Sequence, residues 1–178
     1  MNSSINLLLQ KRTEKNKEKI DSQIWSMFGA NLALAFVDLT AFTQTAKEKG
    51  IIELLHAIYQ VNVIIDSISK KYDGTIIKYL GDGCLLTFKT SDKAIQFAQK
   101  MMTSVKKKDK SVSIAIGYGK IIKTENDIFG NEVNAVFKLE VITKPMEILA
   151  TESLYNDCSL KASFQKKKDY YRSVGISK

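Results

Sequence analysis

Two aspartates, Asp38 and Asp82, are the residues of this sequence best placed to do chemistry. Asp38 ends a short apolar run that predicts a buried strand, and Asp82 lies between two glycines in a predicted hairpin turn. Two carboxylates brought together repel each other unless a cation lies between them. Mg²⁺ prefers oxygen ligands and takes one or two protein carboxylates, with phosphate and water oxygens filling the rest. The pair therefore suggests a metal site, although the spacing alone equally allows two ordinary turn residues.

The hydrophobic pattern predicts the elements that must position these acids. Residues 51–71 carry apolar side chains at helical spacing, and Asp73-Gly74 marks the turn that ends this helix. Residues 75–80 and 84–88 are rich in β-forming side chains and are joined by Gly81-Asp82-Gly83, which predicts a hairpin. The full pattern predicts strands at 32–38, 75–80, 84–88, 111–122 and 147–150, helices at 21–30, 51–71, 92–106, 132–142 and 151–155, and a loop at 123–131.

This order of elements predicts an α+β fold, a ferredoxin-like βαββαβ core with an additional C-terminal helix and strands. In such a core the first and third strands are central neighbours, so the hairpin brings Asp82 to the sheet edge where the first strand ends at Asp38. We expect the helices to pack on one face of an antiparallel-rich sheet, which leaves the other face for ligands or a partner. We expect residues 1–30 to form a leader with a short amphipathic helix, and residues 31–178 to form the domain.

The composition excludes several classes of protein. The chain has 178 residues, 44% hydrophobic and 26% charged, which is ordinary for one soluble domain, and we expect a cytoplasmic protein. No apolar run approaches the ~20 residues that span a bilayer. The single histidine, His56, lies in an apolar helical run, which argues against His-dependent hydrolase triads, and two cysteines predict neither a disulfide framework nor a zinc site. The net charge of +8 favours a phosphate-rich small ligand, and without an aromatic-interleaved basic motif we expect no nucleic acid.

Four segments resemble the motifs of one enzyme family. Residues 36–43, F-V-D-L-T-A-F-T, resemble the F-x-D-I-x-G-F-T signature of class III adenylyl and guanylyl cyclases. Residues 78–82, K-Y-L-G-D, resemble the K-x-x-G-D hairpin of that family, and residues 127–134, D-I-F-G-N-E-V-N, resemble its D-x-x-G-x-x-V-N segment. Residues 116–119 match its I-G-x-x-x-G strand less closely. The motifs occur in the expected order, and the resemblance covers most of the chain.

The resemblance implies a site for two divalent cations, Mg²⁺ or Mn²⁺, at Asp38 and Asp82 with Leu39 beside them. One ion would lower the pKa of the ribose 3′-hydroxyl, and the other would clamp the phosphates. Backbone N–H groups at a helix start would cradle the phosphates. These N–H groups belong to Thr40, Ala41, Phe42 and Thr43.

The resemblance also implies how the rest of the nucleotide is held. Lys78 matches the purine-selecting position, where adenylyl cyclases have Lys and guanylyl cyclases usually have Glu. An ammonium group only donates, so it suits the acceptor N1 of adenine and not the N1–H of guanine. Asp127 matches a second purine contact that accepts from the adenine amino group, Asn134 the residue that orients the ribose, and Lys138 the residue that stabilises phosphate charge. Each also has an ordinary explanation, as an exposed strand residue, a loop cap, a helix-start residue and a helix-surface lysine.

The sequence departs from the family pattern in several places. Lys138 keeps the charge and spacing of the usual Arg but loses its bidentate fork, and Ala41 replaces a Gly. A phosphate-binding Lys normally lies in a C-terminal Lys-Gly pair, and the nearest match is Val174-Gly175 with Arg172 and Lys178 close by, so that role stays unassigned. The last strand of the family is expected to be missing.

Taken together, the resemblance implies an adenylyl cyclase that converts ATP to 3′,5′-cyclic AMP and pyrophosphate. In this family one domain supplies the metal aspartates and the other the purine, ribose and phosphate contacts. The chain has both sets, which predicts a head-to-tail homodimer with two equivalent sites. The alternative is a catalytically silent cyclase-like domain that binds nucleotide or regulates a partner. A guanylyl cyclase and a nucleic-acid-binding module rank behind both, since no RNP-type aromatic pair lies on the candidate strands.

Overall fold

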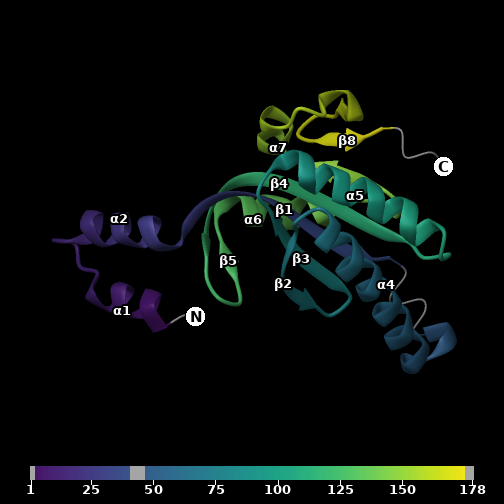
Figure 1. The fold of residues 1–178 in the computed structure, drawn as a ribbon, viewed down its shortest axis with the longest axis horizontal. Coiled ribbons are helices and arrows are strands. Elements are labelled where there is room, and N and C mark those ends of the chain that lie inside the picture. Colours follow the sequence, from purple (N-terminus) through teal and green to yellow (C-terminus); the bar gives the residue numbers. More distant parts are fainter. Residues whose placement is uncertain (1–2, 41–46, 175–178) are drawn as a thin grey trace.

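An eight-stranded sheet forms the centre of the protein, seen in a computed structural model that describes residues 3–40 and 47–174 (Figure 1). The strands are β1 (Gly29–Leu39), β2 (Thr75–Leu80), β3 (Gly83–Phe88), β4 (Val112–Lys123), β5 (Ile128–Phe129), β6 (Ile148–Ala150), β7 (Phe164–Lys166) and β8 (Tyr171–Ser173). Their order is β2-β3-β1-β4-β6-β8-β7, with β5 paired to β4. β1 lies antiparallel to both β3 and β4, and β6 lies parallel to β4. The first four strands thus have the predicted ferredoxin-like order, and the α+β class is confirmed.

Helices cover both faces of this sheet. They are α1 (Ser3–Lys11), α2 (Lys17–Phe28), α4 (Ile51–Lys71), α5 (Ser91–Lys106), α6 (Asn131–Glu140) and α7 (Glu152–Asp157), with a 3₁₀ turn η1 (Lys161–Ser163). Alternate residues of β1 divide between the faces: Ala35 and Val37 pack with buried residues of α4 and α5, whereas Leu34 and Phe36 pack with those of α6. The prediction that helices cover one face was therefore wrong. α6 lies on the face that was expected to be open, and it buries Val136 there.

The long helix α4 has two apolar faces. Leu54, Val61 and Ile65 are buried in the core against the sheet and α5, while Ile52 and Tyr59 are 76% and 64% exposed. This double pattern makes α4 the one described helix that is long and apolar enough to cross a membrane. Its buried face already packs in the core, so α4 is placed as a core helix of the domain.

The N-terminal helices form a separate small cluster beside the sheet, as Figure 1 shows. Ile5 of α1 packs with Ile20 and Ile24 of α2, and the Arg12 guanidinium donates to both carboxylate oxygens of Asp21, at 2.6 and 2.9 Å. α2 ends at Phe28 and β1 starts at the next residue, so the strand begins inside the predicted leader. The division into residues 1–30 and 31–178 stays a prediction.

Short strands account for most of the remaining differences from the predicted elements. β5 lies within the predicted loop at 123–131, and β7 and β8 form a hairpin after residue 155, where no element was predicted. α4 has the predicted bounds. Thr151 caps α7 as predicted, because its hydroxyl accepts from the N–H of Leu154 at 3.4 Å.

The close approach of α6 to β4 depends on two glycines of β4. A Cβ atom added at Gly117 would lie 2.4 Å from Oε1 of Glu132 and 2.6 Å from Cγ2 of Val136. A Cβ atom at Gly119 would meet the Glu132 side chain at 3.0 Å and beyond. The helix therefore lies directly on the bare backbone of β4, which fixes the height of α6 above the sheet.

We predict that Gly117→Ala destabilises the fold by about 2 kcal/mol, because the buried, β-branched Val136 cannot move aside without strain. Gly119→Ala should cost less than about 1 kcal/mol, since its tight contact at 3.0 Å involves only the partly exposed Glu132 side chain, which can shift by a few tenths of an ångström, and since alanine restricts the unfolded chain. Urea unfolding of both variants measures the difference. Equal stabilities for the two variants would show that α6 does not lie as tightly on β4 as described.

Candidate active site

The two aspartates meet at one edge of the sheet, as the sequence predicts. Asp38 lies near the end of β1, opposite Gly83 of β3. Asp82 occupies the two-residue turn between β2 and β3, after Gly81 in the left-handed conformation at φ +62°. The N–H of Leu39 donates to the carbonyl oxygen of Asp82 at 3.3 Å. This bond and the β1–β3 register hold the two acidic residues side by side.

The charges that shift the pKa values of the acids at this edge come from other acids. Burial, then the charges of Asp82 and Glu140, raise the pKa of Asp38 to about 6. Burial and Asp82 also raise the pKa of Glu140, at the C-terminal end of α6. Within residues 3–40 and 47–174, no lysine or arginine forms an ion pair with any of the three acids. A cation would relieve this repulsion, and carboxylate oxygens are the ligands that Mg²⁺ and Mn²⁺ accept.

The donor set at this edge fits a metal that keeps ligands from elsewhere. Among the described residues, no three Asp, Glu, His or Cys side chains are grouped closely enough to hold a metal ion. Mg²⁺ commonly binds through one or two carboxylates and completes its shell with water and phosphate oxygens. The Leu39 side chain has no ligating atom and is buried in the core, so Leu39 would contribute its backbone carbonyl oxygen.

Glu140 was not singled out by the sequence analysis. One signal pointed to it: an acid at the C-terminal end of a helix faces the negative end of the helix dipole, which is unfavourable without another role. Its proximity to Asp82 depends on how α6 crosses the sheet, which no local pattern reveals.

Lys78 and Asp127, separated by 49 residues in sequence, form a half-exposed ion pair. The Lys78 ammonium donates to Oδ1 of Asp127 at 2.7 Å, and the N–H of Ile128 donates to the same oxygen at 2.8 Å. Burial acts to raise the pKa of Asp127, but the bonds from Lys78 and Ile128 and the Lys78 charge outweigh it and hold the pKa below its usual value. The Thr124 hydroxyl accepts from the N–H of Asp127 at 3.2 Å and holds the turn. The structure thus brings together the two residues predicted to contact the purine.

Asn134 and Lys138 lie on the outer side of α6. Both are exposed and one helical turn apart, while Val136 and Leu139 face the sheet. Glu140, whose pKa is raised in part by the charge of Asp82, projects from a different side of the helix. Within one chain, therefore, the two α6 residues point away from the Asp38–Asp82 edge.

The predicted phosphate cradle is only partly described. Thr40 donates its backbone N–H to the carbonyl oxygen of Ser111 at 3.1 Å, so this group is already bonded and does not fit the predicted role. Ala41, Phe42 and Thr43 lie outside the described residues. Arg172, noted as a nearby cation at the C-terminus, pairs with Glu147 at 2.6 Å.

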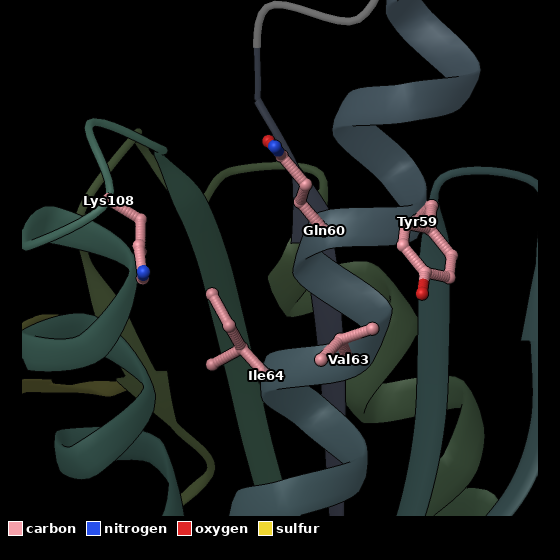
Figure 2. Close-up of a pocket in the computed structure, with 5 residues that line it drawn as sticks. All are labelled: Tyr59, Gln60, Val63, Ile64 and Lys108. Carbon is pink, nitrogen blue, oxygen red and sulfur yellow. The ribbon is translucent and has the colours of Figure 1, made fainter.

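A pocket of about 270 Å³ lies elsewhere, on the outer side of α4, and is shown in Figure 2. Its lining comprises Tyr59, Gln60, Val63, Ile64 and Lys108. Next to it, exposed His56 bonds to Gln60 at 2.7 Å, which agrees with a surface role for this histidine. The pocket contains none of the predicted site residues and carries no acidic group, so the acid pair and the ion pair define the candidate site.

A sheet of this topology, with paired acids at the end of β1 and in the β2–β3 turn, is the arrangement of a class III nucleotidyl cyclase domain. The family model described as "Adenylate and Guanylate cyclase catalytic domain" matches residues 28–174, and the chain belongs to this family.

Among curated proteins, the chain is similar to distant relatives from mycobacteria. An uncharacterised protein of Mycobacterium tuberculosis is 21% identical over 123 residues, which are 68% of this chain and 32% of that protein. The chain thus spans about a third of the length of the curated relatives it matches.

Two solved structures share the fold. The monomeric guanylyl cyclase domain of the RhoGC fusion protein from the fungus Blastocladiella emersonii superposes with a TM-score of 0.74 at 18% identity, covering 84% of this chain and 99% of that one. The adenylyl cyclase CyaB from P. aeruginosa gives a TM-score of 0.71 at 20% identity, covering 83% and 95%. At these identities the structures establish the fold, and both purine specificities occur among them.

The raised pKa of Asp38 gives a prediction about pH. The folded state favours the protonated carboxyl, so this contribution to stability is complete below the unfolded pKa of ~4 and is lost as pH rises through about 6. Asp38→Asn removes the charge at every pH. In EDTA at pH 7.5 it should be more stable than the wild type by about 1–2 kcal/mol, after a discount for solvent screening of this half-buried group. This difference corresponds to a rise in melting temperature of roughly 2–8 °C. At pH 4.5 the gap should be much smaller.

Thermal melts of both proteins at the two pH values measure this effect. Asp109→Asn is the matched control, because Asp109 is exposed and has φ +53°, which asparagine tolerates. A gap between wild type and Asp38→Asn that does not widen with pH would contradict the described environment of Asp38.

Proposed function

We propose that this domain is an adenylyl cyclase that converts ATP to 3′,5′-cyclic AMP and pyrophosphate, and that it acts in the cytoplasm. The observation that carries the choice of ATP is the Lys78–Asp127 ion pair. Adenine offers an acceptor, N1, beside a donor, its amino group, whereas guanine offers N1–H beside the acceptor O6. A lysine that donates and a carboxylate that accepts match adenine.

The pair also supports discrimination between the two purines. When adenine binds, the direct bond between Lys78 and Asp127 is replaced by one bond from each to the base, so both groups stay satisfied. Guanine would place its N1–H against the ammonium and its O6 against the carboxylate. A polar group left unpaired on desolvation costs about 1–3 kcal/mol, and more when it is charged.

Asp38 and Asp82, with the Leu39 carbonyl oxygen, would hold two divalent cations, Mg²⁺ or Mn²⁺. When bound, these ions lower the pKa of the ribose 3′-hydroxyl and neutralise charge on the triphosphate. The protein's task is to present both carboxylates ionised at one edge. Since the pKa of Asp38 is about 6, this requires neutral or higher pH when no cation is present.

The reaction forms a bond between the ribose 3′-oxygen and the α-phosphorus. It breaks the bond between the α-phosphorus and the oxygen that bridges the α- and β-phosphates. The 3′-hydroxyl proton leaves to solvent, and pyrophosphate departs with the bonding electron pair. No residue need act as a covalent nucleophile. Asn134 would orient the ribose and Lys138 would neutralise charge on the transferring phosphate, so catalysis comes from positioning and charge. The phosphate cradle would come from the backbone of residues 41–43.

Two copies of the chain would build each site. Asn134 and Lys138 point away from the Asp38–Asp82 edge of their own chain, so a second chain must supply one of the two sets. A head-to-tail homodimer with two equivalent sites meets this need.

A catalytically silent domain that binds nucleotide is the second candidate. Lys138 favours it, because a lysine replaces the fork of donors that an arginine gives to phosphate. The Asp38–Asp82 pair favours the enzyme. Product formation separates the two candidates.

We predict that the purified protein makes cyclic AMP from ATP with Mn²⁺ or Mg²⁺, and that Asp38→Asn and Asp82→Asn each reduce the rate at least about 100-fold. Asparagine keeps the shape of aspartate but loses the charge that binds the cation. Asp109→Asn should retain full activity. Chromatographic assay of product, with circular dichroism to check folding, measures this, and activity retained by either site variant would refute the metal role.

We further predict that Lys78→Glu combined with Asp127→Cys lowers the ratio of kcat/KM for ATP to that for GTP by about 10- to 100-fold. Glutamate accepts from guanine N1–H, and the thiol can donate to O6. The Arg172→Lys variant, which alters a surface ion pair, is a control that should leave the ratio unchanged. An unaltered ratio in the double variant would remove the ion pair from the purine site.

A further inference from the structure

The side chain of Glu132 joins three elements through one oxygen atom. Glu132 is the second residue of α6. Its Oε1 accepts from the N–H of Tyr118 on β4 at 3.1 Å, from the Thr151 hydroxyl at 2.5 Å and from the Ser153 hydroxyl at 2.7 Å. Thr151 is also the N-cap of α7. A carboxylate with several donors forms stronger hydrogen bonds than a neutral acceptor, so this contact ties the start of α6 to the sheet and to α7.

The surrounding backbone is shaped for this carboxylate. Gly117 leaves bare the position where a Cβ atom would lie 2.4 Å from Oε1, and Gly119 lies under the Cβ and Cγ atoms of Glu132. Thr151 is itself fixed, because its N–H donates to the carbonyl oxygen of Ile116 at 3.0 Å. The acceptor therefore meets donors that are already held in place.

The apolar contacts of α6 set which face of the helix meets the sheet. Apolar burial is not directional, so it defines the exact rotation of the helix less sharply than hydrogen bonds do. Gly130 precedes the helix and supplies no side-chain cap. The three hydrogen bonds of Glu132 are thus the directional restraint at the start of the helix. Asn134 lies two residues after Glu132, and Lys138 lies six residues after it. A change in the rotation of α6 would therefore move the side chains of Asn134 and Lys138.

We propose that Glu132 is a positioning residue that sets the rotation of α6, so that Asn134 and Lys138 face the nucleotide held by the partner copy. The inference rests on the proposed function for the roles of those two residues. Lys78 and Asp127 lie on β2 and on the turn before β5, whereas the hydrogen bonds of Glu132 go to Tyr118, Thr151 and Ser153. Glu132 therefore acts on the reacting groups and not on purine binding.

Three substitutions separate reach from charge. Glu132→Gln keeps the acceptor oxygen at the same reach and loses the charge, whereas Glu132→Asp keeps the charge and loses one methylene of reach. Because small misplacements near reacting groups cost up to about 100-fold, we expect Glu132→Asp and Glu132→Ala to lower kcat about 10- to 100-fold. Glu132→Gln should stay within about 3-fold of the wild type, and KM for ATP should change less than about 3-fold in all three.

A general loss of stability must be excluded as the cause. Ser91→Ala is the matched control, since it removes another part-buried bond to a carboxylate, from Ser91 of α5 to Asp157 at 2.6 Å. Asp157 is the last residue of α7, at the opposite end from the Thr151 cap that bonds to Glu132. It should lower the melting temperature but keep kcat. If Glu132→Ala keeps kcat, if Glu132→Asp retains more activity than Glu132→Gln, or if KM alone rises, the positioning role is wrong.

Amide hydrogen exchange tests the restraint without any assay of activity. In Glu132→Ala, amides of α6 should exchange at least about 10-fold faster than in the wild type, while those of α5 keep their rates. Unchanged exchange in α6 would overturn the inference. A wild-type protein that makes no cyclic nucleotide but shows this difference would refute the proposed function and leave the restraint on α6 standing.

Discussion

The register between β1 and β3 is the constraint on which the candidate site depends. Because side chains alternate between faces along a strand, a shift of one residue would turn Asp38 toward α4 and α5. The register is held by burial on both sides: Val37 belongs to the core under α4 and α5, and Phe36 to the cluster under α6. Gly83 contributes as well, since a Cβ atom there would lie 2.4 Å from the Phe36 ring. The tight pairing brings Asp82 next to Asp38 although their charges repel.

Repulsion at this edge is therefore maintained by packing elsewhere in the domain. β3 is buried along its whole length, and β1 is buried over most of its second half. Such burial is the dominant favourable contribution to folding, and it allows a few unfavourable charges at the end of one strand. The raised pKa of Asp38 follows from this arrangement, because the carboxyl is partly buried and lies near other acids. Strain of this kind is typical of functional sites, where local rules are broken and the surrounding fold compensates.

Much of the fold could be predicted from the sequence because the main elements are long and strongly periodic. The bounds of α4 follow from its apolar spacing and from the Asp73-Gly74 turn. The position of α6 could not be predicted, because the central strands are buried on both faces and show no alternation that marks one side as exposed. β5, β7 and β8 have two or three residues each, too few to show a period.

The site shows the same division. Asp38, Asp82, Lys78 and Asp127 were predicted, since each lies in a short motif at fixed spacing. Glu140 and Glu132 were not, because their roles arise from contacts between distant segments. Glu132 meets Tyr118 and Thr151, which are 14 and 19 residues away in sequence. No propensity or motif encodes such a contact, and only the Gly117 and Gly119 pair on β4 hints that a helix must approach there.

The proposed site between two copies of the chain would use three groups of residues, and each group is positioned by different contacts. The positions of Asp38 and Asp82 depend on the β1–β3 register, and the Lys78–Asp127 ion pair depends on the turn before β5. The outer residues of α6 depend on the hydrogen bonds of Glu132. A different part of the chain therefore positions each of these groups of residues. Asn134 and Lys138 point away from Asp38 and Asp82 of the same chain. On the proposed reaction, the nucleotide is what brings the groups together across the interface. In a single chain without nucleotide, the acids would repel each other. The two residues proposed to contact the purine would stay paired with each other, as Lys78 and Asp127 are here. Turnover would require a bound cation, a separated ion pair and a second copy at the same time, so each of these steps offers a point at which activity can be limited.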